Sequence, residues 1–227
     1  MSWFAHLTRL GTAHVVYEQE RDNSCGPSVI LTANFFLKRG SAALTASAGI
    51  GMSPLTAPLI GPWLVREALR RAMRTEPEVY RIYSAVTGTL YDGTTYSIAD
   101  YFPEVLRRLG LGLWETTYVG PAGVSGALRR SAAKGAPTLV HTTWDAGGAH
   151  FVCVDQVIER GGTFATACDP WDGEVHLIPL HRDKEVPYNP NAKLAALSLG
   201  RFKSRDYAPN SSQGKFSGWI TRRIDAR

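Results

Sequence analysis

Cysteine is scarce in this sequence, which contains three thiols, Cys25, Cys153 and Cys168, among 227 residues. Three cysteines are too few for a disulfide scaffold in a chain of this length, and no close-spaced Cys or His pair indicates a zinc site. We therefore expect free thiols, no metal and no cofactor. Synthesis in a reducing, cytoplasmic compartment fits this cysteine usage best.

A secretory signal peptide is also lacking, because the N-terminus has no basic start followed by an apolar run and a small-residue cleavage site. Secretion by a route that reads no such signal stays open. Residues 41–65 carry no charged side chain and are long enough to cross a membrane, but prolines and glycines interrupt them. We expect an irregular segment there and no transmembrane helix.

The net charge of +5 is concentrated at one end of the chain. Residues 181–227 hold ten Lys or Arg against four Asp or Glu, a local charge of +6, which leaves about −1 for the preceding 180 residues. This tail has no basic face with interleaved aromatic residues, so we expect no specific nucleic-acid partner. The organisation predicted is one domain over 1–180, with an atypical segment at 41–90, and a basic extension over 181–227 that packs on it.

A helix is expected to begin at Cys25, because apolar residues recur after it at helical spacing. Ser24 is in place to cap this helix, and Pro27 lies in its first turn, where a missing N–H group costs nothing. The N-terminus of a helix favours negative charge, so a thiol there is readily held as the thiolate.

Helices followed by antiparallel strands predict an α+β fold with its helices on one side of the sheet. Gly40 is expected to end the first helix. Further elements are predicted from periodicity and turn signals. They are helices over 63–74, 95–109 and 124–133, an extended stretch over 79–91, and strands over 12–18, 113–118, 138–144, 150–158, 163–169 and 174–179.

Two of these strands form a predicted hairpin with a four-residue loop at 159–162. Ile158 then faces Thr163 and, counting back, Val152 faces Asp169. A one-residue slip of this register would exchange the faces of one whole strand.

His150 shares a face with Val152 in this register, because alternate residues of a strand point the same way. It is therefore a diagonal neighbour of Asp169, about 7–8 Å away at the backbone, within reach of long polar side chains. The same register sets Cys153 opposite Cys168, where we expect two free buried thiols.

These residues suggest nucleophilic catalysis by a thiol. Cys25 is the candidate nucleophile, His150 its base and Asp169 the group that orients the base. Gln19 lies across a short turn, where its side-chain amide and the backbone N–H of Cys25 would form an oxyanion hole. Gly26 leaves room for a substrate beside the sulfur.

The sequence resembles the papain-like cysteine peptidases, and most closely their bacterial branch, the bacteriocin-processing (double-glycine leader) peptidases. In that branch the third catalytic residue is an aspartate followed by proline. The resemblance covers residues 12–180 and rests on ordered motifs together with the segments 93–110 and 128–140. The motifs are Gln19, Asp22-Asn23-Ser24-Cys25-Gly26-Pro27, Gly148-Ala149-His150-Phe151-Val152 and Asp169-Pro170.

The resemblance implies a papain-like fold, in which a helical half with the Cys-bearing helix packs against an antiparallel β-sheet half. It also implies the catalytic set Cys25, His150, Asp169 and Gln19. Trp171 stands where papain-like enzymes have a tryptophan that shields the catalytic pair from water, and we assign Gly26, Gly148 and Trp171 to the substrate-binding surroundings. The leader peptidases are usually fused to a transporter and an ATPase, which this chain lacks.

Three functions follow as hypotheses. The first is a cysteine peptidase that cleaves an extended peptide in a groove between the two halves, which residues 41–62 help to line. The second uses the same triad for deamidation, transglutamination or amide hydrolysis, as a bacterial effector or toxin. The third is a peptide-binding module without catalysis. The partner in each case is a peptide or protein, and the sequence does not predict an oligomeric state.

Overall fold

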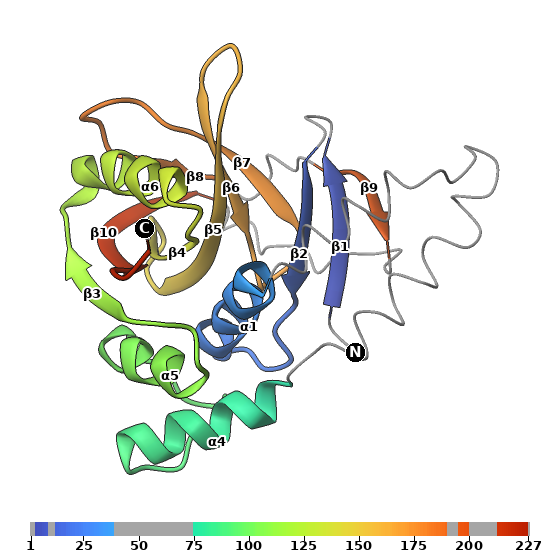
Figure 1. The fold of residues 1–227 in the computed structure, drawn as a ribbon, viewed down its shortest axis with the longest axis vertical. Coiled ribbons are helices and arrows are strands. Elements are labelled where there is room, and N and C mark those ends of the chain that lie inside the picture. Colours follow the sequence, from blue (N-terminus) through green and yellow to red (C-terminus); the bar gives the residue numbers. More distant parts are fainter. Residues whose placement is uncertain (1–2, 9–11, 39–74, 190–194, 200–212, 227) are drawn as a thin grey trace.

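The structure is a computed structural model that describes residues 3–8, 12–38, 75–189, 195–199 and 213–226. The helix expected over 63–74, Gly40 and the charge-free segment 41–62 lie outside the described residues. The described chain is a mixed α+β fold with antiparallel sheets (Figure 1). Its helices are α1 (Cys25–Leu37), α4 (Glu76–Thr87), α5 (Phe102–Arg108) and α6 (Val124–Ala133), with 3-10 turns at Ala99–Tyr101 and Pro121–Gly123.

The larger sheet is antiparallel and seven-stranded. The order of its strands is β3-β10-β4-β5-β6-β7, so that the C-terminal strand β10 lies between β3 and β4. The short strand β8 also pairs with β10. Across the sheet, the strands are β3 (Trp114–Tyr118), β10 (Gly214–Arg223), β4 (Thr138–Trp144), β5 (Ala149–Glu159), β6 (Thr163–Cys168) and β7 (Val175–Pro179), with β8 (Pro187–Tyr188) off this path.

A second, three-stranded sheet has the order β2–β1–β9. Its strands are β1 (Trp3–Thr8), β2 (Ala13–Tyr17) and β9 (Ala195–Leu199). Strand β2 leads directly into the turn before α1, so this sheet borders the Cys-bearing helix (Figure 1).

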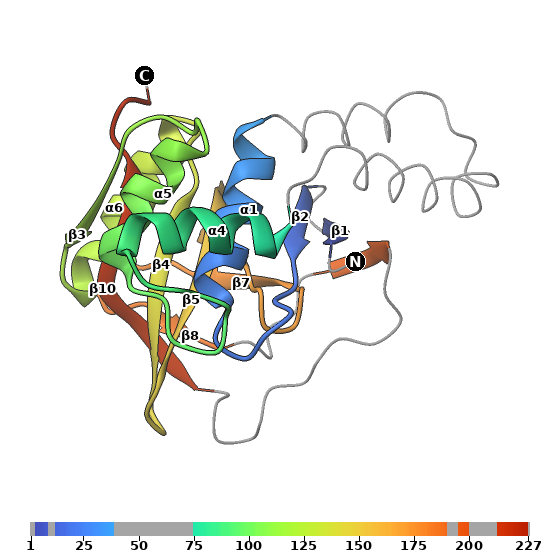
Figure 2. The ribbon, with the colours of Figure 1, turned by 90° about the horizontal axis from the view of Figure 1, so that it is seen from below.

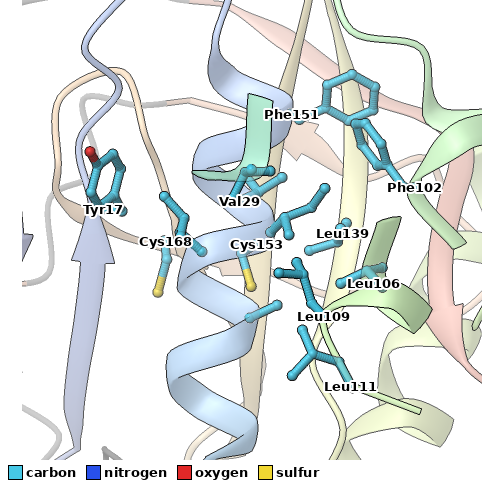
Figure 3. Close-up of a cluster of buried hydrophobic side chains, with 14 of the residues drawn as sticks. Tyr17, Val29, Phe102, Leu106, Leu109, Leu111, Leu139, Phe151, Cys153 and Cys168 are labelled. Carbon is cyan, nitrogen blue, oxygen red and sulfur yellow. The ribbon is translucent and has the colours of Figure 1, made fainter. Parts of the chain in front are cut away.

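Alternate residues of the same strands divide the core into two clusters on the two faces of the large sheet. On one face Leu139, Phe151 and Cys153 pack with α1, α4 and α5. Figure 3 shows α1 in the middle of this cluster, with Tyr17 on its β2 side and Leu109 on its α5 side. Figure 2 shows α4 lying across α1.

The opposite face is covered by α6, whose Ala127 and Leu128 pack on Val140, Val152 and other residues of the second cluster. The prediction that all helices lie on one side of the sheet is therefore wrong for α6. The apolar side of α6 suits either face of the sheet equally well. Only the alternation of buried residues along β4 and β5 identifies the face that α6 covers.

The expected extended stretch over 79–91 is also wrong, because most of it is helix α4. Val79 and Tyr83 are buried at helical spacing, Pro77 lies in the first turn and Gly88 ends the helix in the left-handed conformation with φ 72°. The aromatic and β-branched residues of this stretch favoured a strand, because such residues are enriched in strands. The proline at the helix start and the glycine at its end were signals for a helix.

The other elements predicted within the described residues are present, with small shifts at their ends. The helix expected over 95–109 is shorter, because the regular part is confined to α5 and a preceding 3-10 turn. Among the described residues, no helix combines the length and the hydropathy needed to cross a membrane.

Candidate active site

Cys25 is the first residue of α1 and is partly buried. Ser24 occupies the N-cap position but makes no capping hydrogen bond with its side chain. Instead its hydroxyl donates to the Glu76 carboxylate at 3.0 Å. The predicted helix start is thus correct, whereas the predicted capping by Ser24 is replaced by a contact to another helix.

The β5–β6 hairpin sets the positions of the candidate base and its orienting carboxylate. At the hairpin end the register differs from the prediction by one residue, since Glu159 and not Ile158 pairs with Thr163. A shift between Val154 and Gln156 inserts one extra residue in β5, a β-bulge.

Beyond the bulge, Cys153 pairs with Cys168 as predicted. His150 and Asp169 therefore share a face of the sheet for a reason that the sequence argument did not contain. A loop one residue shorter than expected is offset by a bulge of one residue.

His150 donates from Nε2 to Oδ1 of Asp169 at 2.8 Å. Both side chains are buried, and Asp169 is completely enclosed. Burial opposes the charged imidazolium, but the charge of Asp169, its hydrogen bond and the contact with Cys25 outweigh it and raise the pKa of His150 to about 10. The imidazolium is thus the favoured form at neutral pH.

Cys25 makes a hydrogen bond with the His150 ring, and this contact contributes to the raised pKa of His150. Because Nε2 is bound to Asp169, Nδ1 is the ring nitrogen that remains for the sulfur. The Trp144 ring lies nearly parallel to the imidazole, with centroids 6.1 Å apart. The three side chains that the sequence selected thus form one connected chain of contacts.

Asp169 accepts three donors. Besides His150, Oδ1 accepts the backbone N–H of Trp171 at 2.8 Å, and Oδ2 accepts the hydroxyl of Tyr188. Burial favours the neutral acid, but the charge and hydrogen bond of His150, the charge of His176 and the hydrogen bond from Tyr188 outweigh it and hold the pKa of Asp169 well below its usual range. The carboxylate therefore keeps its charge inside the protein.

Gln19 lies in the turn before α1 and is buried. Its side-chain Nε2 donates to the backbone carbonyls of Arg21 and Asp22 at 2.7 and 3.0 Å. Its backbone N–H donates to the carbonyl of Pro170 at 2.7 Å, which ties the turn to the Asp169 loop. Gln19 thus stands at the junction of the two candidate catalytic segments, with its amide donors directed into its own turn.

The assigned substrate-binding residues lie in different surroundings. Gly26 is buried, and a Cβ built on it would lie 2.1 Å from Ser97 Oγ, so protein atoms occupy the space beside it. Gly148 is exposed in the turn before β5 with φ 94°, a conformation that suits glycine. Trp171 is half-buried, and its backbone contacts Asp169.

Glu76 is a buried acid that the sequence argument missed. Its Oε1 accepts the hydroxyl of Ser28 at 2.5 Å and the backbone N–H of Glu20 at 3.1 Å, in addition to Ser24, and its Oε2 accepts Tyr80. One carboxylate thus joins α4 to both sides of Cys25. The available signal was a glutamate next to Pro77 at a helix start, which sequence alone connects to nothing distant.

Within the described ranges of the chain, two buried groups bring ligand-type atoms within 4.8 Å of one another. In the first, His14 Nδ1 lies 2.7 Å from Asp155, with Cys168 beside them. In the second, His176 Nε2 lies 3.1 Å from Asp172, next to Asp169. Each histidine is within hydrogen-bond distance of its aspartate, as in an internal polar network.

No protein-family model matches the sequence, and no curated protein matches it either.

Proposed function

We propose that this protein is a thiol hydrolase, a cysteine peptidase with a papain-like fold, in which Cys25, His150 and Asp169 are the catalytic residues. The single observation that supports the proposal is the contact chain from Cys25 through His150 to a fully buried, ionised Asp169. A thiol at a helix N-terminus beside an imidazolium is an activated nucleophile.

The reaction follows from these contacts. The Cys25 thiolate attacks the carbonyl carbon of an amide, and the carbonyl oxygen takes the negative charge. His150 gives its proton to the departing nitrogen as the C–N bond breaks, which leaves a thioester on Cys25. Water then attacks the thioester, His150 accepts a proton from it, and the acid product leaves as the C–S bond breaks, which restores the Cys25 thiolate beside protonated His150.

The oxyanion needs donors beside the sulfur. The Cys25 backbone N–H belongs to the first turn of α1, where N–H groups have no partner within the helix. Gln19 is the second proposed donor, and its amide would have to turn from the carbonyls of Arg21 and Asp22 toward the substrate. Tight-binding aldehyde inhibitors, which form a tetrahedral adduct, would draw it there.

Alkylation by iodoacetamide at pH 6.5 tests the proposal, because an isolated thiol is protonated there and reacts slowly. We expect one modified residue, Cys25, and a loss of rate of about 10²-fold in His150→Ala, because a free thiol with a pKa of about 8.5 is only about 1% ionised at this pH. Cys153 and Cys168 are matched controls, since burial raises the pKa of both thiols and neither is exposed. Labelling of Cys25 at the same rate in His150→Ala as in the wild type would contradict the proposal.

Peptide hydrolysis and deamidation use the same triad and give different products. The protein is incubated with a peptide library and with glutamine-containing proteins, and the masses are read afterwards. Fragments that disappear in Cys25→Ala support a peptidase. A gain of one mass unit without cleavage would replace the peptidase by a deamidase and leave the thiol chemistry intact.

A further inference from the structure

Tyr188 belongs to the basic extension, to which the sequence assigned no catalytic part. It forms β8 together with Pro187 and pairs with Gly214 of β10. Its side chain is completely buried, among the second core cluster.

The hydroxyl of Tyr188 donates to Oδ2 of Asp169, while Oδ1 of the same carboxylate holds His150. Oδ1 is thus shared by His150 and the backbone N–H of Trp171, whereas Oδ2 accepts the hydroxyl of Tyr188 from another segment. A carboxylate bound at one oxygen alone can rotate about its χ2 torsion, which is broad for aspartate. A donor fixed at the other oxygen removes that freedom.

The ring of Tyr188 is itself held by aromatic neighbours. It stacks on Phe216 with centroids 5.7 Å apart and an interplanar angle of 25°. Trp144, which also lies beside His150, and His176 contact it at 5.6 and 6.1 Å. The position of the hydroxyl is therefore determined by β4, β7 and β10 together.

We infer that Tyr188 is a positioning residue for the proposed thiol hydrolase, acting on His150 through Asp169. It holds the carboxylate so that Oδ1 meets Nε2, and it donates to the charge that stabilises the imidazolium. The extension after residue 180 then supplies part of the active site. This inference depends on the proposed function of Cys25, His150 and Asp169.

The variant Tyr188→Phe removes the hydroxyl and keeps the ring that packs on Phe216. We expect alkylation of Cys25 at pH 6.5 to slow by about 10-fold, the size of one lost hydrogen bond to a charged group. With a peptide substrate, kcat should fall while KM stays within about twofold, as for loss of an interaction made in the transition state.

Tyr83→Phe is the matched control, because Tyr83 is also buried and its hydroxyl accepts the backbone N–H of Ile98 at 2.6 Å, outside the triad. It should lower the melting temperature without changing the alkylation rate. Tyr188→Phe should change both.

A second readout requires neither turnover nor high stability. Titration of the His150 ring followed by ¹⁵N NMR should give a lower pKa in Tyr188→Phe than in the wild type. In the Asp169→Ala background the same substitution should have no further effect, because its route to His150 is gone.

Two failures are distinguishable. If wild-type alkylation does not depend on His150, the proposed function fails. If it depends on His150 but Tyr188→Phe changes neither the rate nor the His150 titration, Tyr188 is a core residue only and this inference is overturned.

Discussion

Glu76 is a buried acid of α4, and four groups donate hydrogen bonds to it. Burial raises the pKa of Glu76, against the lowering effect of its hydrogen bonds from Ser28, Tyr80, the Glu20 backbone and Ser24. A glutamine fits the same place, since its carbonyl can accept the three donors at Oε1 and its amide nitrogen can donate to Tyr80.

Glu76→Gln should therefore fold and should flatten part of the pH dependence of stability. An acid whose pKa is raised by folding stabilises the fold below its unfolded pKa, and this contribution is lost as pH rises through the folded pKa. We expect the wild-type free energy of unfolding to fall more between pH 4 and pH 8 than that of Glu76→Gln. Urea denaturation at both pH values measures the difference.

Glu76→Ala gives the contrasting result, because it leaves buried hydroxyls without an acceptor. A loss of about 1–3 kcal/mol is expected for the unsatisfied groups. Equal pH slopes in wild type and Glu76→Gln would show that Glu76 does not titrate in this range.

At this scale the sequence was sufficient for some residues and insufficient for others. The position of Cys25 follows from helix periodicity, which is a local pattern. The shared face of His150 and Asp169 was predicted from strand alternation, but the structure reaches it through a shorter loop and a β-bulge. Glu76 and Tyr188 act on positions 52 and 19 residues away through side chains. No local pattern marks a donor or acceptor that is used so far along the chain.

At the scale of the elements, the segment that follows α4 packs around the start of α1. Tyr91 donates its hydroxyl to the Asn23 carbonyl at 2.9 Å, and Asn23 Nδ2 donates to the Thr94 carbonyl at 2.7 Å. Ser97 and Phe102 approach Gly26 so closely that a Cβ there would lie 2.1 and 2.7 Å from their atoms.

Gly26→Ala should therefore destabilise the protein by about 1–3 kcal/mol, as overpacking does, despite the better helix propensity of alanine. Thermal unfolding measures the loss, and loss of Cys25 alkylation should accompany it because α1 must move. The double variant Gly26→Ala with Ser97→Gly should recover part of the stability, since it removes the nearer of the two clashing side chains.

Gly126→Ala in α6 is the control for helix propensity. A Cβ there meets Arg130 Nη1 at 3.2 Å, the far end of a flexible side chain. It should be neutral or stabilising by up to about 1 kcal/mol. If Gly26→Ala behaves in the same way, the close packing at the start of α1 is not what requires glycine.

Strand β10 lies in the extension, for which the sequence predicted no helix or strand. Gly218, with φ 99°, lies where its pairing with β4 shifts between Phe216 and Ile220. A bulge breaks the alternation that identifies a strand. The strands β4 to β7, in contrast, were predicted nearly to the residue, because turn signals flank each of them.

On the scale of the whole molecule, β8 and β10 of the basic extension belong to the seven-stranded sheet. β10 pairs with β3 on one side and β4 on the other, and it places Phe216 and Ile220 in the second core cluster. Its deletion would remove the pairings with β3, β4 and β8 and two buried apolar side chains at once.

A chain that ends at residue 213 should fail to fold. Loss of buried Phe and Ile side chains costs about 2–5 kcal/mol each, a large part of the 5–15 kcal/mol that stabilises a typical domain. Circular dichroism and limited proteolysis of the truncated protein measure this. A chain that ends at residue 225 is the control and should fold, and native-like resistance of the shorter chain would show that β10 is dispensable.

The bulge in β5 separates the two ends of the β5–β6 hairpin. Residues 159–162 are exposed at a tip that extends from the rest of the described fold (Figure 1), while pairing on the far side of the bulge is set by the buried Cys153 and Cys168. A change in the length of the loop at the tip therefore need not shift the strand register at His150. A reporter peptide inserted between Gly161 and Gly162 should therefore leave the position of His150 unchanged.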